Sequence, residues 1–418
     1  MDAPSPSQHR LGRSVPPLLA FSTVVLAAVN LRPGISSLGP VLTEVQDAFG
    51  QGGSFGGLLT AIPGFAFGLF GVIAVVIARR LGLTGAMLLG TAVTLVGLAA
   101  RPWVGSAWMF ALLTVCVAAG IAVGNVLLPA WIKRHGGDRS VRLMTIYTSV
   151  LGAGGAFGPI TALVFLDRQG EPMWQPVLFA WAVLAALPLL AWVLTLRATG
   201  YDFPPDPPAE HAPAVPVWRS STAVFMMLMF GLQSMQAYVQ FGWLPAMLTG
   251  AGISPGIGAA AVIVTHGLGI VAGLVMPTVV ERSRRLPVIV TSFGLFAAAG
   301  YGTIILIHLD LVGSWGVPAA LLAAVLLGVG GWCFATAIAL IPARTRSPLI
   351  TAKLSGFVQP VGYILAGLGP LAVGAGFEWA GSWIPVLVAL IVSCLLLSVA
   401  GWRAATGPTV DDQLTSQR

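Results

Sequence analysis

Long apolar stretches, separated by short polar connections, recur along nearly the whole chain. Each is close to the length of about 20 residues that an α-helix needs to cross a bilayer. The pattern predicts an all-α membrane protein with twelve transmembrane helices. Their expected limits are 16–42, 53–78, 83–101, 106–132, 142–166, 174–197, 220–247, 256–280, 286–308, 315–341, 351–376 and 382–402.

Charged residues sort by connection. Basic residues gather at every second connection, whereas the other connections carry mostly acids and, as basic exceptions, Arg101 and Arg168. Cytoplasmic connections of membrane proteins are enriched in Lys and Arg, so we expect both termini in the cytoplasm. The basic connections contain Arg79, Arg80, Lys133, Arg134, Arg139, Arg197, Arg219, Arg282, Arg284, Arg285, Arg344 and Arg346.

Composition excludes several functional classes. The 418 residues are 56% hydrophobic and only 8% charged, against about 25% charged residues in soluble domains. The net charge of +7 follows from topology, so we expect a lipid bilayer and no nucleic acid as partner. Five scattered histidines and no Walker motif argue against an enzyme or an ATP-driven pump. The three cysteines lie in apolar stretches, so neither a disulfide framework nor a metal or cofactor site is expected, and we expect a monomer.

The longest connection divides the chain in two. Residues 198–218 contain six prolines and several acids and predict an extended cytoplasmic linker that tolerates replacement. It separates an N-terminal six-helix half (1–197) from a C-terminal six-helix half (219–403), which a tail (404–418) follows. Short motifs recur in both halves at offsets of about 210 residues: 79–81 with 284–286, Pro129 with Pro342, and 158–159 with 369–370. A parallel repeat of six spans is typical of the major facilitator fold, with the substrate site between the halves.

Arg32 is the most informative single residue. It lies inside the first apolar stretch, after Asn30 and before Pro33. A charge at that depth costs a few kcal/mol, so it usually faces a protein interior or a water-filled path. The nearest acid in sequence is Glu44, and the guanidinium fork suits carboxylate or nitrate-like groups. Arg32 and the nearby Asn30 are therefore candidate solute ligands. The alternatives for Arg32 are that it snorkels outward or bonds carbonyls of a helix broken at Pro33.

Polar side chains recur at helical spacing in two later spans. An amide in lipid would lack partners, so these stripes should face the bundle interior, either toward solute or toward neighbouring helices. The residues are Gln233, Gln236, Gln240 and Trp243 in the seventh span, and Ser355, Gln359 and Tyr363 in the eleventh.

Two further polar residues lie in spans. Asn125, beside Gly124, is a solute-contact or a helix-packing residue. His266 is a solute ligand, a proton carrier or a structural histidine, since its charge changes near neutral pH. Proton-coupled carriers usually bury a carboxylate. None lies well inside a predicted span, so exchange or facilitated diffusion competes with proton coupling.

Four segments carry a family resemblance: NLRP at 30–33, GNVLLPAWIKR at 124–134, GWLPAML at 242–248 and LSGFVQPVGY at 354–363. They resemble the cyanate/nitroimidazole transporter (CynX/NimT-like) family of the major facilitator superfamily. The resemblance implies an inner-membrane carrier for a small polar or anionic solute, such as cyanate or a small nitroaromatic, in either direction. The loop VIARRLG at 76–82 departs from the superfamily pattern, because it lacks the usual carboxylate; Glu281 is the candidate gating acid of the second half.

We therefore expect a secondary transporter that works by alternating access. The alternatives are a drug or metabolite efflux antiporter of the same superfamily, and a non-transporting sensor built on the same fold.

Overall fold

The computed structural model describes residues 15–166, 173–203, 216–346 and 348–415, and every regular element of more than one residue in these ranges is a helix. The longer helices are α1 (Pro17–Asn30), α4 (Gly53–Ala100), α5 (Ala107–His135), α6 (Ser140–Val164), α7 (Trp174–Thr199), α8 (Ser221–Thr249), α9 (Pro255–Arg282), α10 (Leu286–His308), α11 (Gly316–Gly330), α12 (Cys333–Ala343), α13 (Pro348–Ala380) and α14 (Trp383–Thr406). Short helices are α2 (Pro33–Ser36), α3 (Leu42–Ala48) and α15 (Val410–Thr415), with 3-10 turns that include η2 (Gly39–Val41) and η3 (Arg101–Trp103).

The helices account for twelve spans. Ten segments of the described chain are long and apolar enough to cross a membrane, and the bent helix α6 makes eleven. Helix α4 supplies the twelfth, because its 48 residues would measure about 72 Å against a hydrocarbon core of about 30 Å. Gly82, with φ of 81°, turns the chain between its two halves. The predicted all-α fold is confirmed.

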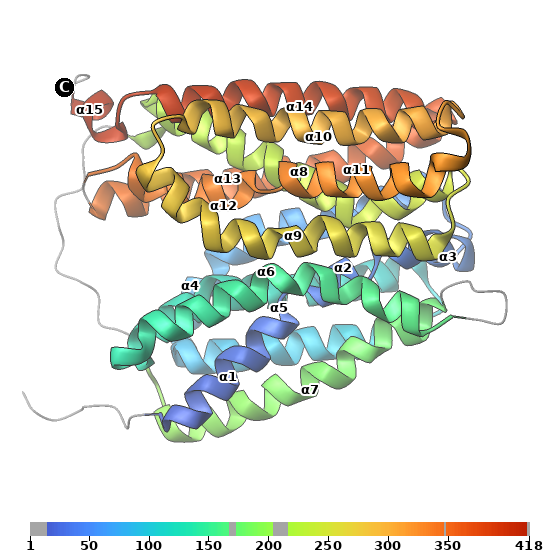
Figure 1. Ribbon diagram of the computed structural model, residues 1–418. Helices are drawn as coiled ribbons and strands as arrows, with labels where there is room; N and C mark the ends of the chain where they lie inside the picture. The colour runs from blue at the N-terminus through green and yellow to red at the C-terminus, as the bar shows by residue number, and fades with distance from the viewer. Residues whose placement is uncertain (1–14, 167–172, 204–215, 347, 416–418) are drawn as a thin grey trace, which may run out of the picture.

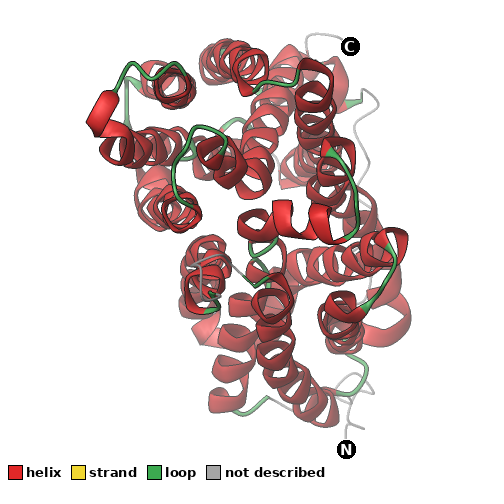
Figure 2. Ribbon diagram, turned by 90° about the vertical axis from the view of Figure 1, so that its right-hand side faces the viewer, coloured by secondary structure: helices red, strands yellow, loops and turns green. Residues whose placement is uncertain are grey.

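Two bundles of six spans lie against each other. Figure 1 shows α1 to α7 in the lower bundle and α8 to α14 in the upper one, and Figure 2 shows the same division looking along the helices. The start of α1 and helix α15 lie at one end, which we call the linker end. Helix α3 and the start of α14 lie at the other end, the far end.

The first span is broken where Arg32 lies. One helix over 16–42 was expected, but α1 ends at Asn30 and the chain continues as α2, η2 and α3 as far as Ala48. Proline lacks an N–H and disfavours helical geometry in the residue before it. Arg32 accordingly takes φ −127° and ψ −43°. The tenth span is also broken, between Gly330 and Cys333.

The two halves touch through glycines at the far end. A Cβ added to Gly64 of α4 would lie 2.7 Å from the Gly367 Cα of α13, and one added to Gly57 would lie 2.9 Å from the Pro370 carbonyl oxygen. The Ser54 N–H donates to the Glu378 carboxylate across the same seam at 2.8 Å, and the Ser54 hydroxyl donates to it too. This seam therefore closes the far end.

Toward the linker end the corresponding helix positions lack such close contacts. A Cβ added to Gly273 of α9 or Gly356 of α13 would meet no described atom within 4 Å. Val72 of α4 is 58% exposed and Leu274 of α9 is 61% exposed. The close glycine contacts described for this seam therefore belong to the far-end part of α4 and α13.

The predicted linker is in part a packed element. Residues 204–215, with most of its prolines, lie outside the described residues, but Asp202 is buried against the Gly82 turn. The Thr84 N–H and hydroxyl donate to its carboxylate at 3.0 and 2.6 Å, and His135 Nε2 lies 2.8 Å from it. Burial raises the pKa of Asp202, but the hydrogen bonds from His135 and Thr84 outweigh it and hold the pKa below its usual range. Within the described part of the predicted linker, Asp202 is therefore packed against the Gly82 turn and brings a carboxylate to the loop at 76–82, which has none of its own.

Candidate functional site

The break in the first span presents Arg32 to both halves of the molecule. Its guanidinium interacts electrostatically with Tyr147 of α6, Tyr238 of α8, His266 of α9 and Tyr363 of α13. Tyr363 also interacts with Tyr147 and Tyr238, so the three hydroxyls gather around one cation. We call Arg32, Tyr147, Tyr238, His266 and Tyr363 the central cluster.

The charge of Arg32 is not neutralised by a carboxylate in the described part of the chain. Among the described residues no carboxylate forms an ion pair with it, and the ion pairs present lie at the linker end, between His135 and Asp202 and between Arg346 and Asp412. An arginine that is half-buried without a carboxylate retains its capacity to bind an anion through paired N–H groups.

Aromatic rings bound the central cluster. The His266 imidazole stacks on Phe241 with ring centroids 3.6 Å apart and planes at 6°. Its buried Nε2 has no hydrogen-bond partner in the described part of the chain. Phe67 and Phe230 both lie edge-on to the Tyr363 ring, with ring centroids 5.4 Å and 5.0 Å from it. The cluster therefore combines a cation and phenol hydroxyls with flat apolar walls.

The small-residue run of α6 allows this approach. A Cβ added to Gly154 would lie 3.1 Å from Arg32 Cβ, and one added to Gly155 would lie 3.1 Å from His266 Cβ. Larger side chains at these positions would displace the two polar residues. The glycines thus hold helices from both halves close to the broken span.

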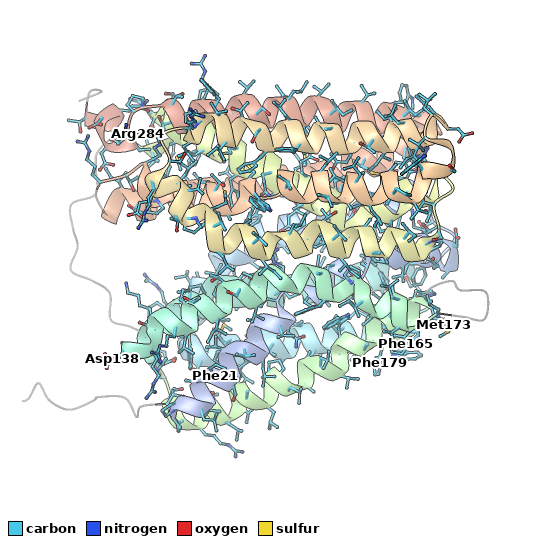
Figure 3. The ribbon with its side chains drawn as sticks, viewed as in Figure 1. Phe21, Asp138, Phe165, Met173, Phe179 and Arg284 are labelled. Carbon is cyan, nitrogen blue, oxygen red and sulfur yellow. The ribbon has the colours of Figure 1, made fainter. Side chains whose placement is uncertain are left out.

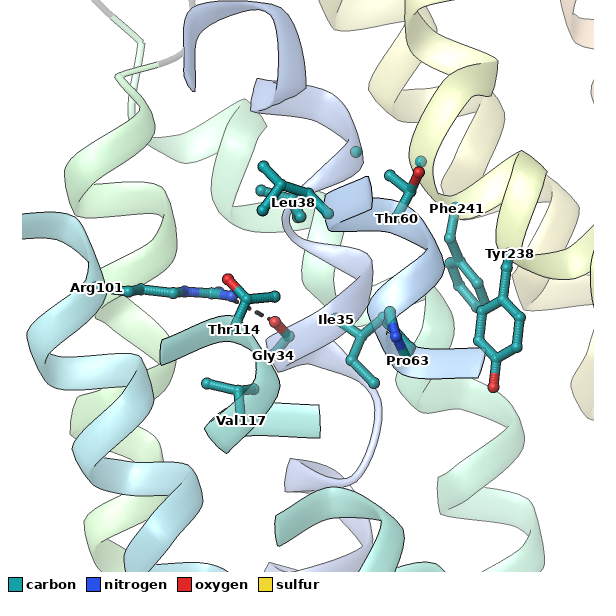
Figure 4. Close-up of a pocket in the computed structure, with 13 residues that line it drawn as sticks. Gly34, Ile35, Leu38, Thr60, Pro63, Arg101, Thr114, Val117, Tyr238 and Phe241 are labelled. Carbon is teal, nitrogen blue, oxygen red and sulfur yellow. Dashed lines mark hydrogen bonds between the residues drawn. The ribbon is translucent and has the colours of Figure 1, made fainter. Parts of the chain in front are cut away.

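A second arginine supports the break. Arg101 is 1% exposed, and its NH2 group donates to the Gly34 carbonyl at 3.0 Å. Figure 4 shows Arg101 reaching Gly34 from one side of the broken segment, with Tyr238 and Phe241 on the other. The arginine that binds a carbonyl of the broken helix is Arg101, which the sequence suggested to be a loop cation.

The glutamines Gln236 and Gln240 of the seventh span bond within their own half. Tyr301 of α10 donates to the Gln236 side-chain oxygen at 2.7 Å, and the Gln236 amide donates to Ser393 of α14 at 2.6 Å. Gln240 also interacts with Tyr301. The Trp243 ring packs edge-on against the Trp383 ring of α14, with ring centroids 5.7 Å apart. Solute contact by these three residues stays a prediction, while the face of α8 toward Arg32 carries Tyr238 and Phe241.

The remaining predicted residues occupy varied positions. Asn30 is buried at the end of α1, and Asn125 is half-buried in α5. Gln359 donates to Ser355 at 2.7 Å one turn from Tyr363. Glu281 is exposed at the linker end of α9. Of the predicted set, Arg32, His266 and Tyr363 are brought together.

Sequence reasoning missed Tyr147, Tyr238 and Arg101. A buried tyrosine in an apolar span gives no periodic signal, because its ring suits both core and lipid boundary. Within the described residues no group of three His, Cys, Asp or Glu side chains is arranged to hold a metal ion.

Comparisons with known proteins agree with this architecture. Residues 24–370 match the family model of the Major Facilitator Superfamily. The 2-nitroimidazole transporter of Escherichia coli is 30% identical over 92% of this chain and 94% of its own length. An uncharacterised transporter of Bacillus subtilis, YycB, is 28% identical over 95% and 96%, and the cyanate transport protein CynX of Escherichia coli is 25% identical over 86% and 90%.

Solved structures share the fold at low identity. A bacterial homologue of the human lysosomal transporter Spinster, in an inward-facing and unoccupied conformation, has a TM-score of 0.73 at 16% identity and covers 96% of this chain and 98% of its own. A D-xylose–proton symporter has a TM-score of 0.73 at 9% identity, over 94% and 98%.

Proposed function

The chain belongs to the major facilitator superfamily and to its CynX/NimT-like family, and from this premise we propose that it carries a small anion across the membrane by alternating access. Its relatives are transporters rather than enzymes. The observation that carries the proposal is Arg32, a cation in a broken span that has no carboxylate partner among the described residues and interacts with tyrosines from both halves.

The chemistry favours a compact anion such as cyanate. A guanidinium gives two parallel N–H donors, and phenol hydroxyls from Tyr147, Tyr238 and Tyr363 add donors that rotate to suit the ligand. An anion between them would neutralise Arg32 and link the two halves through one ligand. Such a ligand gives the differential affinity that a conformational change requires.

The seam between the halves at the far end supports a rocking mechanism. With basic connections at the linker end, the positive-inside rule favours a cytoplasmic position for this end and for both termini. In the proposed mechanism the structure corresponds to a state that is closed at the far end, away from the cytoplasm. The opposite state requires the Gly64–Gly367 and Ser54–Glu378 contacts to part.

A flat nitroaromatic solute is the second candidate. The parallel stack of His266 on Phe241, together with the edges of Phe67 and Phe230 near Tyr363, provides walls for an aromatic ring, and a nitro group would face Arg32. This candidate corresponds to efflux, as in the drug and metabolite antiporters.

Flux in proteoliposomes tests the proposal. Purified protein should give saturable uptake of radiolabelled cyanate and counterflow when unlabelled cyanate is trapped inside, and the same assay with 2-nitroimidazole ranks the two solutes. A channel would give flux without counterflow. Absence of flux for both solutes, in protein shown to be folded, would favour a sensor and contradict the transport proposal.

A further inference from the structure

A second cavity lies at the linker end, away from the central cluster. It is formed between the start of α1 and the turn from α5 to α6, and has a volume of about 250 Å³. We call it the basic groove, lined by Phe21, His135, Arg139, Arg142, Leu143 and Ile146.

The groove carries exposed positive charge. Arg139 and Arg142 are both exposed, and neither forms an ion pair with a carboxylate among the residues described. Two acids are near in the chain or in space: Asp138 is exposed on the same turn, and Asp202 is buried under bonds from His135 and Thr84. The two guanidinium groups therefore remain available to an anion.

Apolar side chains continue the groove along the outer face of α1. Phe21 is 46% exposed and Leu18 is 77% exposed. Figure 3 shows Phe21 on α1 and Asp138 farther toward the linker end of the same half. The surface thus passes from guanidinium groups to hydrocarbon in the direction of the bilayer core. Free phosphate or a soluble metabolite would use the first part alone.

We propose that the basic groove binds an anionic phospholipid, with the phosphate between Arg139 and Arg142 and an acyl chain along Leu18 and Phe21. Basic pockets between transmembrane helices at the membrane surface are suited to acidic headgroups. The site is separate from the proposed solute site. It lies on the turn whose His135 holds Asp202, so the lipid contacts the element that fixes the end of α7 to the Gly82 turn.

Native mass spectrometry of the full-length protein tests the assignment. Phosphatidylglycerol and phosphatidylcholine are added in equal amounts to detergent-solubilised wild type, to Arg139→Gln/Arg142→Gln, and to the control Arg284→Gln/Arg285→Gln in the other half. Both control arginines are exposed, and Arg284 lies at the same end of the molecule (Figure 3). Lys133 and Arg134 keep the positive-inside signal in the first variant.

We expect wild type and control to retain phosphatidylglycerol over phosphatidylcholine, and the Arg139/Arg142 variant to bind it about 25-fold more weakly, since each surface arginine contributes roughly fivefold. Equal phosphatidylglycerol retention by the two double variants would overturn the proposal. Thermal unfolding distinguishes lipid from free phosphate. If inorganic phosphate stabilises wild type as much as phosphatidylglycerol does, the assignment to lipid is overturned.

If the Arg139/Arg142 variant does not fold, Phe21→Ser/Leu18→Ser is used in its place. This variant should weaken phosphatidylglycerol retention without removing charge, and unchanged retention would contradict the proposal.

Discussion

Substituting Gly64 by alanine should open the far end of the molecule. The Cβ of alanine would lie 2.7 Å from both the Cα and the nitrogen of Gly367 in α13. Non-bonded carbon atoms prefer separations of about 3.5–4.0 Å, so the two backbones must move apart by about 0.8 Å at this point. No flexible side chain is available to absorb the displacement, because both contacted atoms belong to the backbone.

In the proposed alternating-access mechanism the cost falls on one conformation only. Overpacking costs about 1–3 kcal/mol, and in the proposed outward-open state the α4–α13 seam would be parted, so that the methyl group would meet no obstacle. A difference of that size shifts a two-state equilibrium by about 5–150-fold. The gain in helix propensity from glycine to alanine applies to both states and does not change their ratio.

Distance measurements between spin labels detect the shift. Labels at Gln51 and Trp379 lie at the far end on opposite halves, and both side chains are exposed. Cys116, Cys333 and Cys394 are replaced beforehand. Gly64→Ala should populate a longer label distance than wild type. Gly302→Ala is the matched control, because a Cβ at Gly302 of α10 meets no described atom within 4 Å. Identical distance distributions for Gly64→Ala and wild type would refute the view that this seam is the far-end gate.

Three further results are expected. Asp202→Asn should lower the free energy of unfolding by about 2 kcal/mol at pH 7, because it removes the charge-assisted hydrogen bonds that the carboxylate makes with Thr84 and His135. Since the folded pKa of Asp202 lies below its ordinary value of 3.8, the difference from wild type should be constant above that pH and vanish as pH falls through the folded value; a difference that grows in acid would contradict the assignment. Replacing residues 204–215 by a Gly/Ser linker of equal length should preserve transport, and loss of flux in correctly inserted protein would show a specific role for that segment. His266→Gln should either leave transport unchanged or abolish proton-driven accumulation while sparing counterflow; full proton-driven accumulation would show that another group carries the proton.

Apolar length and loop charge were sufficient to predict the helices, because the bilayer imposes both. The exact path of the first and tenth spans was not predictable in the same way. Pro33 indicated a weak point, but the continuation to Ala48 and the break at Gly331 and Trp332 depend on packing against other helices.

Helical spacing showed which residues share a face but not which neighbour that face meets. Gln236 and Gln240 lie on one stripe, as predicted, yet this stripe meets Tyr301 of the same half. Arg101 illustrates the same limit. The sequence around an arginine at the end of an apolar run does not tell whether its side chain is solvated or, as here, donates to the Gly34 carbonyl. Asp202 had an indirect signal, the absence of a carboxylate at 76–82, but only the fold shows that a later segment supplies it.

Direct binding by Arg32 variants tests the central claim. Equilibrium binding of radiolabelled cyanate to purified protein is measured for wild type, Arg32→Gln, Arg32→Lys and the exposed control Arg284→Gln. Loss of charge-assisted hydrogen bonds costs about 1.5–3 kcal/mol, so Arg32→Gln should bind at least about tenfold more weakly. Arg32→Lys should be intermediate, because an ammonium lacks the planar fork, and the control should match wild type. Wild-type affinity in folded Arg32→Gln would contradict the account that this arginine holds the solute.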